Sequence, residues 1–363
     1  MLIEIRNLLN KIAYKYLVRP ILFMFDAEKV HNLFIGIGKA LGSNFITRSL
    51  VKLFYSYNDS RMQQEIFGIR FRNPVGLAAG FDKNAEMINV IESTGFGFSE
   101  VGSITAKACK GNEGKRLERI KEKKSLWVNL GLNNKGADEI SGRLRGKKFG
   151  IPIGISIAKT NCKENKETKK GIEDYIYSLR KFDKEKIGDF FVLNISCPNS
   201  YGGRDFGDPK LYGLLLKEVE KLGIKKPIFV KLSPDLGKKE IDKIVELSRG
   251  RIKGFVISNL SKKHEIGKGG LSGKVIEERA NEMLRYVYKK GKGEFILIGV
   301  GGIFSVRDAY KKIKSGANLV ELITGMVYEG PGLIGEINYG LKRLLEKGGY
   351  NNIGEAVGKG IRN

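Results

Sequence analysis

The stretch FILIGVGGI at residues 295–303 shows the pattern that decides the fold. It is a run of uncharged apolar residues that ends in paired glycines, which is typical of a strand buried on both faces of a parallel sheet. Similar runs recur along the chain, separated by longer segments with helical periodicity such as residues 238–248 and 277–288. The runs cover residues 74–79, 96–104, 151–158, 190–195, 228–232, 254–258, 295–300 and 319–324. Eight strand–helix units within about 260 residues predict an α/β fold, a (β/α)8 TIM barrel.

The composition fits a folded globular protein with a basic surface. The chain has 363 residues, of which 41% are hydrophobic and 29% are charged. Its 65 Lys and Arg exceed its 40 Asp and Glu by 25, which favours anionic partners: nucleic acid, a negatively charged lipid surface or small anions. Much of the excess is Lys dispersed singly or in pairs, whereas nucleic-acid-binding surfaces cluster basic residues with aromatic ones. We therefore expect a solvated basic surface and no nucleic-acid partner.

The cysteines and histidines argue against several kinds of site. Cys109, Cys162 and Cys197 are widely spaced and form no CxxC pair, so a disulfide framework, a zinc ribbon and an iron–sulfur cluster are poorly supported. The two histidines, His31 and His264, lie far apart in the chain. We expect a reducing compartment and no metal site.

The first fifty residues predict an amphipathic helical extension. Ile5, Leu8 and Ile12 fall at helical spacing, and Lys and Arg residues lie between them. A second helix is expected to begin after Asp26, which is a good N-cap. Charged residues interrupt every apolar stretch before the roughly 18 residues that a spanning helix needs, so we expect no transmembrane segment. The apolar faces could lie on a membrane surface or pack on the body of the protein, and periodicity alone favours packing.

In a (β/α)8 barrel the chemistry lies where the strands end, so the residues that follow the eight runs are the candidates for a site. Most are basic or neutral hydrogen-bonding residues, which suit a planar anionic ligand better than a divalent cation. They are Lys83, Ser103, Thr105, Ser156, Lys159, Asn194, Cys197, Asn199, Lys231, Ser233, Asn259, Ser261, Gly301, Gly302, Thr324 and Gly325. The glycines of GVGGI, and of ITG at residues 323–325, follow the last two runs, where barrels often bind a phosphate.

Cys197 directly follows a buried run, in NISCPNSYGGR at residues 194–204. A free Cys beside a strand is more often a small buried hydrophobe than a catalyst. The flanking Asn194 and Asn199, with Lys83 and Lys231 at other strand ends, favour a catalytic role here.

Seven motifs, in order along nearly the whole chain, resemble those of the dihydroorotate dehydrogenase family. They are NPVGLAAGFDKN (73–84), EVGSIT (100–105), NISCPN (194–199), VKLSPD (230–235), GGLSG (269–273), IGVGGI (298–303) and GPGLI (330–334). The resemblance implies a flavoprotein that binds FMN at the mouth of the barrel and oxidises dihydroorotate to orotate in de novo pyrimidine (UMP) biosynthesis. The helical extension and the GFDKN motif resemble the membrane-associated class 2, which implies a membrane quinone as the final electron acceptor.

The class 2 resemblance also implies how the chain is divided and where it acts. Residues 1–50 would form the membrane-associating helical extension, and residues 51–363 the FMN-binding barrel. The protein would be peripheral, on the cytoplasmic side of the cell membrane and bound to its anionic surface. We favour a monomer.

The same motifs imply roles for individual residues. Cys197 occupies the position of the base that removes the C5 proton of dihydroorotate, where class 2 enzymes carry Ser and class 1 enzymes carry Cys. A thiol pKa of about 8.5 lies closer to working pH than that of a Ser hydroxyl, so we expect a functional base. Substrate binding is implied for Lys83, Asn129, Asn194, Asn199, Asn259 and Ser261. Binding of FMN is implied for Ala79, Gly80, Ser103, Ser156, Asn194, Lys231, Ser258, Gly273, Gly301, Gly302, Thr324 and Gly325.

Other positions also depart from the family pattern. Residues 127–134 contain one residue fewer than usual between Asn129 and the glycine, and Ser156 replaces an Asn expected against FMN. Leu260 and Ser261 stand where the family usually has Thr. Two alternatives stay open: the same oxidation with fumarate or another soluble acceptor, and a non-catalytic basic barrel that binds anionic lipid or nucleic acid.

Overall fold

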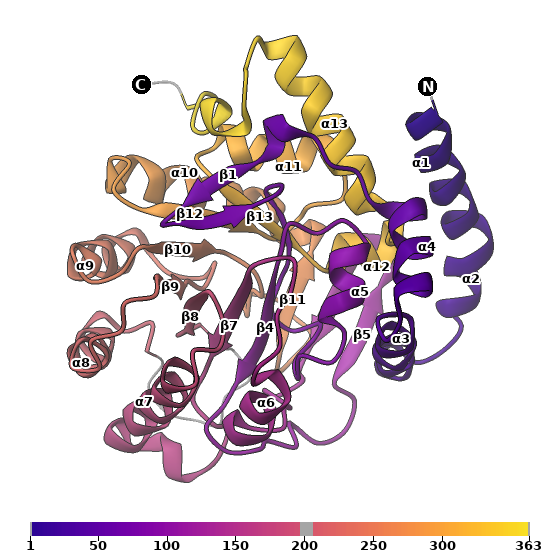
Figure 1. Ribbon diagram of the computed structural model, residues 1–363. Helices are drawn as coiled ribbons and strands as arrows, with labels where there is room; N and C mark the ends of the chain where they lie inside the picture. Colours follow the sequence, from indigo (N-terminus) through magenta and orange to yellow (C-terminus); the bar gives the residue numbers. More distant parts are fainter. Residues whose placement is uncertain (1, 197–205, 362–363) are drawn as a thin grey trace.

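Eight parallel strands close into a barrel in the computed structural model, which describes residues 2–196 and 206–361 (Figure 1). The order around the barrel is β10-β12-β13-β3-β4-β7-β8-β9. The strands are β3 (Val75–Leu77), β4 (Phe98–Ile104), β7 (Ile153–Ile157), β8 (Phe190–Asn194), β9 (Ile228–Lys231), β10 (Gly254–Ile257), β12 (Ile296–Val300) and β13 (Leu319–Leu322). Each lies within one of the eight predicted runs, which confirms the (β/α)8 fold.

Helices cover the outside of the barrel, as the periodic segments predicted. They are α5 (Ile88–Ser93), α6 (Ala137–Leu144), α7 (Thr168–Lys184), α8 (Pro209–Glu220), α9 (Lys238–Ser248), α10 (Glu277–Gly291), α11 (Val306–Lys314), α12 (Thr324–Glu329) and α13 (Leu333–Gly348). Their inward faces bury apolar residues such as Leu215, Ile244 and Leu341 against the strands. Helix α9 has the predicted bounds, and α10 extends three residues further than predicted.

Aromatic rings fill the amino-terminal end of the barrel interior. Phe98 lies 5.5 Å from Phe71 between ring centroids, and Phe190 lies 5.5 Å from Phe229. Phe71 belongs to the hairpin of β1 (Gln64–Ile66) and β2 (Ile69–Phe71), which therefore closes this end. A Cβ at Gly76 would lie 2.3 Å from the ring of Phe98, so this strand position requires glycine. The packed end leaves only the carboxyl ends of the strands open for a ligand.

A small antiparallel sheet, which the sequence did not predict, stands at that open end. It consists of β5 (Leu117–Ile120), β6 (Ser125–Val128) and β11 (Gly270–Gly273). The Ser272 hydroxyl lies 2.8 Å from that of Thr324, which joins this sheet to the residues after β13. One wall of the mouth is therefore built from segments inserted after two different strands.

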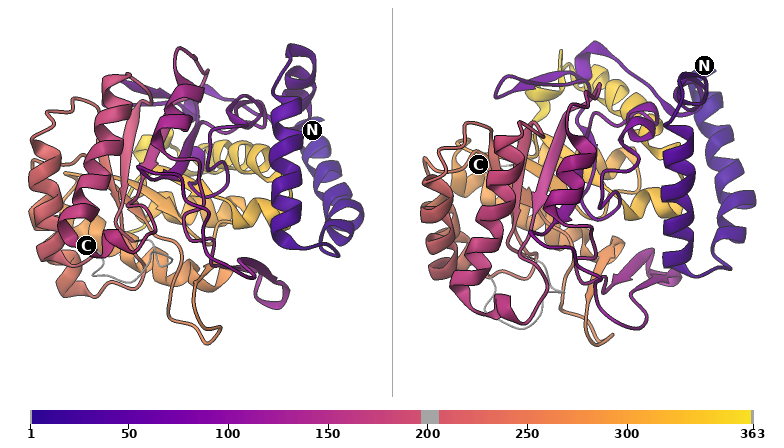
Figure 2. Two further views of the ribbon diagram at one scale, coloured as in Figure 1. Left: turned by 90° about the horizontal axis from the view of Figure 1, so that it is seen from below. Right: turned by 60° about the horizontal axis from the view of Figure 1, so that its bottom comes forward.

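The N-terminal helices gather on one flank of the barrel (Figure 2). Helix α1 (Leu2–Ala13) continues through a π-helical turn (Tyr14–Val18) into α2 (Arg19–Leu22). Helix α3 (Ala27–Leu41) begins after Asp26, whose carboxylate accepts from the amides of Glu28 and Lys29, so the predicted cap is confirmed. A third helix, α4 (Phe45–Tyr55), was not predicted and runs past residue 50.

The flank is fastened to the barrel by polar contacts, while its outer face stays apolar. Lys11 pairs with Glu336 of α13 at 2.9 Å, and the Tyr14 hydroxyl donates to the Val327 carbonyl at 2.8 Å. Large apolar side chains nevertheless point outward, and Leu17 and Phe45 are 66% and 74% exposed. No helix within residues 2–196 and 206–361 is both long and apolar enough to cross a bilayer.

Candidate active site

A cavity of about 650 Å³ opens above the carboxyl ends of the strands, and because half of its lining residues are polar we call it the polar cavity. It is lined by Ala79, Gly80, Lys83, Gly102, Ser103, Val128, Leu130, Leu132, Asn133, Asn194, Ser196, Lys231, Asn259 and Leu260. The residues come from the ends of β3, β4, β8, β9 and β10 and from the inserted sheet, because parallel strands bring their carboxyl ends together. Many of the predicted site residues therefore share one cavity.

Hydrogen bonds fix some of these side chains and leave others available. The Asn194 amide donates to the Ser103 hydroxyl at 2.8 Å, and that hydroxyl lies 3.0 Å from the one of Ser156. Ser156 thus supports the cavity from behind Ser103. In contrast, the Ser258 hydroxyl and the Asn259 carbonyl oxygen are buried and have no partner among the described residues. A buried polar atom without a partner is costly, so these two atoms indicate a ligand with complementary groups.

A second hollow, of about 260 Å³, joins the first near Asn259. Its lining includes the predicted phosphate-binding residues Gly273, Gly301, Gly302, Thr324 and Gly325. A Cβ at Gly302 would lie 2.4 Å from Cβ of Glu277, and one at Gly325 would lie 1.9 Å from the Ile303 carbonyl oxygen. Atoms of neighbouring segments therefore lie close to the backbone at both glycines, as expected for a pocket that binds a small anion through backbone amides. We call this hollow the glycine cradle.

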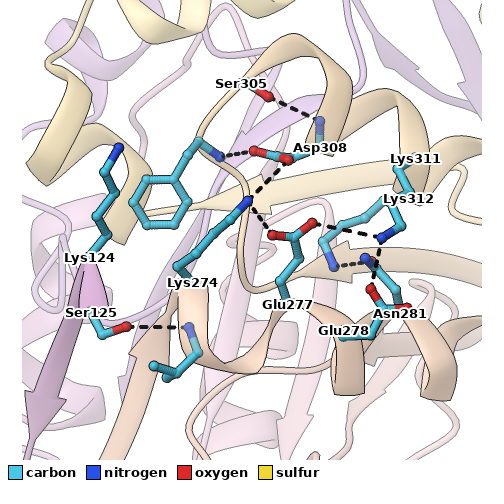
Figure 3. Close-up of polar contacts among 12 residues, drawn as sticks. Lys124, Ser125, Lys274, Glu277, Glu278, Asn281, Ser305, Asp308, Lys311 and Lys312 are labelled. Carbon is cyan, nitrogen blue, oxygen red and sulfur yellow. Dashed lines mark hydrogen bonds and ion pairs between the residues drawn. The ribbon is translucent and has the colours of Figure 1, made fainter. Parts of the chain in front are cut away.

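A charged network holds the glycine loop from outside (Figure 3). Lys274 pairs with Glu277, which packs on Gly302, and lies 3.4 Å from Asp308. The Asp308 carboxylate in turn accepts from the amide of Phe304 at 2.9 Å. Because each of these bonds spans a loop or a helix start, the network fixes the segment that follows β12.

Behind this network lies a Lys that is wholly buried (Figure 3). Lys312 donates from Nζ to Oδ1 of Asn281 at 2.9 Å, and its aliphatic stem reaches the space that a Cβ at Gly299 would occupy. Burial lowers the pKa of Lys312 to about 7, although Glu277 and Asp308 oppose the shift. It supports the strand and does not line the cavities described here.

A third cavity, of about 1120 Å³, lies between the N-terminal helices and the barrel mouth. Most of its lining is apolar and includes Leu22, Phe23, Val30, Phe34, Phe81, Leu117, Leu126, Ile323, Met326, Val327 and Pro331. Its polar lining includes Tyr14, His31 and Arg119, none of which was among the predicted site residues. For His31 the sequence did carry a signal, because Ala27, His31 and Phe34 fall on one face of the predicted helix.

Lys83 borders both the polar cavity and the apolar one. Its Nζ lies 3.1 Å from Nε2 of His31 on α3. Burial lowers the pKa of His31 to about 3, with a smaller effect from Lys83, and burial lowers the pKa of Lys83 to about 8. His31 is therefore neutral at physiological pH and can accept a hydrogen bond from Lys83.

Two Arg residues connect the N-terminal helices to the barrel mouth near the contact between His31 and Lys83. Arg116 pairs with Glu28, and Arg119 donates to the Phe25 carbonyl at 2.8 Å. The Arg119 guanidinium also stacks over the ring of Phe23, 4.7 Å from its centroid. The helices and the barrel mouth thus form one continuous wall around the apolar cavity.

Several predicted site residues do not line the cavities described here, among them Asn129, Ser156, Ser258 and Ser261. Asn129 accepts from the Asn112 side chain at 2.8 Å, while Asn133, four residues further on, lines the polar cavity with an unpartnered carbonyl oxygen. Ser261 donates to Asp235 at 2.6 Å and accepts from Arg279 at 3.0 Å.

The remaining predictions concern the cysteines, Asn199 and the expected absence of a metal site. Cys197 and Asn199 lie outside the described residues, directly after the cavity-lining Ser196. The free thiols of Cys109 and Cys162 are half-buried. Within the described residues, no group of three or more His, Cys, Asp or Glu could hold a metal ion.

Comparison with known proteins identifies relatives over nearly the whole chain. The family model described as dihydroorotate dehydrogenase matches residues 61–345. A protein named dihydroorotate dehydrogenase (quinone) from Christiangramia forsetii is 38% identical over 348 residues, which cover 92% of this chain and 99% of that protein. One of the same name from Haloarcula marismortui is 38% identical over 356 residues and covers 94% of this chain and 98% of its own.

A solved structure agrees with the fold. The crystal structure of DHODH from Eimeria tenella in complex with ferulenol has a TM-score of 0.83 and 26% sequence identity, covering 93% of this chain and 96% of that chain. Because this match spans nearly all of both chains, it supports the barrel fold described above.

Proposed function

Because the chain belongs to the dihydroorotate dehydrogenase family, we propose that it oxidises dihydroorotate to orotate in pyrimidine biosynthesis and delivers the electrons to a quinone. One observation carries this proposal beyond the family name: a polar cavity and an apolar cavity meet at Lys83. A polar substrate and an apolar electron acceptor can therefore reach one cofactor from different sides.

The residues at the barrel mouth fit FMN as that cofactor. The glycine cradle is small enough for a phosphate, and Asn259, whose side-chain carbonyl oxygen is buried without a partner among the described residues, lines both the cradle and the polar cavity. A Cβ at Gly80 would meet nothing closer than 3.8 Å, so the wall leaves room there for a flat ring. When bound, the flavin supplies the hydride acceptor. Lys231, which faces the polar cavity, would hold a positive charge at the ring edge where negative charge develops.

The polar cavity provides groups for the substrate. Asn194 and Asn259 carry the amide donors and acceptors that match a pyrimidine ring, and Lys83 can balance its carboxylate. We propose Asn133 as a further substrate-binding residue, because its carbonyl oxygen lines this cavity without a partner among the described residues. We keep Asn199 as a substrate ligand, since it follows the same strand.

We propose Cys197 as the base that removes the C5 proton. Support comes from the strand end that precedes it, since Asn194 and Ser196 line the polar cavity. Proton and hydride leave from neighbouring carbons, so a base and an acceptor on opposite sides of the substrate allow both to depart without large movement.

The N-terminal helices supply the route for the quinone. Their apolar cavity suits the ring and tail of such a molecule, and their outward apolar side chains suit the surface of a membrane, with basic residues for anionic lipid. We therefore propose that the protein is peripheral on the cytoplasmic side of the cell membrane. The relatives are named for a quinone, which favours this acceptor over fumarate and favours a catalyst over a basic barrel that only binds lipid or nucleic acid.

Anaerobic mixing tests the proposed oxidation. The purified protein, supplied with FMN, is expected to be yellow and to lose its flavin absorbance when dihydroorotate is added. A protein that binds FMN but keeps its colour with dihydroorotate would overturn the assigned substrate, and a protein that takes up no FMN would overturn the cofactor.

A further inference from the structure

Two Glu residues point into the interior of the barrel, from strands on either side of β3. Glu321 on β13 is in register with Gly76, and Glu100 on β4 is in register with Gly154. Cβ atoms at Gly76 and Gly154 would collide with the inward rings of Phe98 and Phe190, so both glycines, and the Glu residues beside them, face inward. The intervening strand offers only small inward residues, which leaves space for the two carboxyl groups to approach each other.

Both carboxyl groups are completely buried, and neither finds a neutral partner. Glu100 and Glu321 have no exposed surface. None of their four carboxyl oxygens accepts a hydrogen bond from a described residue. A buried carboxylate without donors is strongly disfavoured, and two of them side by side are disfavoured further by their repulsion.

Among the described residues, an opposite charge comes from the other side of the barrel. Lys231 on β9 is in register with Val256 and Asn194, so it also points inward, and it is only 8% exposed. Along the eight strands the other inward residues are apolar, glycine or neutral polar ones. Burial, and after it the Glu100 carboxyl, raises the pKa of Glu321 well above its usual range, whereas Lys231 opposes that shift. The interior therefore holds two carboxyl groups and one ammonium group, and both Glu100 and Lys231 act on Glu321.

We propose that Glu100 and Glu321 share a single proton and act together as a positioning pair, whose one negative charge holds the Lys231 ammonium at the floor of the flavin-binding cavity. A pair with both groups ionised would leave a net negative charge inside the barrel. A pair with both groups protonated would leave Lys231 buried without a counter-charge. One proton makes the three groups neutral in sum, which is the cheapest arrangement in a medium of low dielectric constant.

The first test asks how many protons the pair holds, and it needs no activity. Infrared difference spectra at pH 8 would compare the wild type with Glu100→Gln, with Glu321→Gln and with the double variant. Each single variant is expected to lose one protonated-carboxyl band that shifts in D2O, because the remaining Glu becomes ionised opposite Lys231. The double variant should lose the same single band and no second one. A band that persists in either single variant, or two bands lost in the double variant, would overturn the shared proton.

A second test asks what the charge does. The single variants should unfold at nearly the wild-type temperature, since each keeps one negative charge, whereas the double variant should unfold at a clearly lower temperature. Adding Lys231→Met to the double variant should recover much of that loss. Additive losses in the singles, or no recovery with Lys231→Met, would show that the pair does not balance Lys231. Glu65→Gln, an exposed position on β1, is the matched control.

The third readout rests on the proposed function, because it uses bound flavin. The midpoint potential of the flavin should become more positive in the double variant, because the Lys231 ammonium is then left without its counter-charge and favours the anionic reduced flavin, and it should stay close to that of the wild type in the single variants. An unchanged potential in the double variant would remove the pair from the flavin site. Failure of the proposed function would appear differently, as absence of flavin binding in the wild type, and would leave the infrared result intact.

Discussion

The barrel buries its large apolar side chains, whereas the N-terminal helices expose many of theirs. In the barrel, rings such as Phe98 and Phe190 are at most 1% exposed. Among the described residues, the charged ones that point into it are few, and they are Glu100, Glu321 and Lys231. In the N-terminal helical part, Met24, in the turn before α3, and Phe45 on α4 are 82% and 74% exposed, although the inner face packs on the barrel. The barrel is complete in itself, whereas the helices carry a surface suited to something outside the chain. We interpret the barrel as the site of substrate oxidation and the helices as the means of reaching the acceptor.

The largest effect that separates the two regions is expected from Cys197→Ala. If Cys197 is the base, reduction of the flavin by dihydroorotate should slow by at least about 10²-fold, while binding of FMN is kept. Rapid mixing under anaerobic conditions measures this rate. Cys162→Ala is the control, since that thiol lies outside the described cavities. An undiminished rate in Cys197→Ala would remove this residue from the mechanism.

The next largest effect is expected at the glycine cradle, where a substitution should weaken the binding of FMN. Gly302→Ala places a Cβ 2.4 Å from that of Glu277 at a φ of +78°, so we expect the affinity for FMN to fall at least tenfold and stability to fall by about 1–3 kcal/mol. Fluorescence titration with FMN and urea unfolding measure the two effects. Gly293→Ala is a close control, because its φ is +79° and nothing lies within 4 Å of the added Cβ. Equal losses in both variants would show that backbone strain alone, and not the cradle, is responsible.

The exposed face of the helices should matter for membranes and not for chemistry. The double variant Leu9→Asp, Leu17→Glu is expected to reduce sedimentation with anionic vesicles several-fold, because it places charge where apolar side chains would enter the lipid. Flavin reduction by dihydroorotate should keep its rate. Leu214→Glu, an exposed apolar position on α8, should leave vesicle binding unchanged. Vesicle binding that is unaffected by the double variant would contradict a membrane role for this face.

The last of these predictions concerns the contact where the two regions meet. The pKa of His31 is lowered to about 3 from an ordinary 6.5, so the unfolded chain takes up a proton below pH 6.5 that the folded protein does not. His31 therefore makes the protein less stable as the pH falls from the higher value toward the lower one. In His31→Gln the free energy of unfolding should decline less steeply over this range, as urea titrations at several pH values would show. An identical decline would mean that His31 is not buried beside Lys83 in solution.

The sequence predicted the barrel because its strands are continuous apolar runs, a pattern that few structures other than buried parallel strands produce. The inserted sheet was missed because β5 and β11, LERI and GLSG, are short and mostly polar or small. Helix α4 is amphipathic, yet its pattern does not indicate where the helical part ends.

The sequence predicted only those site residues that follow a strand or stand at a position of a family motif. The residues brought by a different segment were not visible, such as His31 from α3. Asn133 and Asn129 are close in sequence, so only the conformation of the loop decides which of them lines the polar cavity. Glu100 and Glu321 carried a signal that was overlooked, because an acidic residue within a buried apolar run demands a partner.

Reoxidation of the reduced flavin is the most direct test of the central claim, that dihydroorotate and quinone reach one flavin from two cavities. The protein would first be reduced with dihydroorotate, then mixed with either a soluble ubiquinone analogue or fumarate in a second anaerobic step. We predict rapid return of the flavin colour with the quinone and none with fumarate, and a slower return with the quinone when a bulky side chain is placed in the apolar cavity by Val30→Trp. Rapid reoxidation by fumarate, or reoxidation by the quinone that Val30→Trp does not slow, would contradict the account.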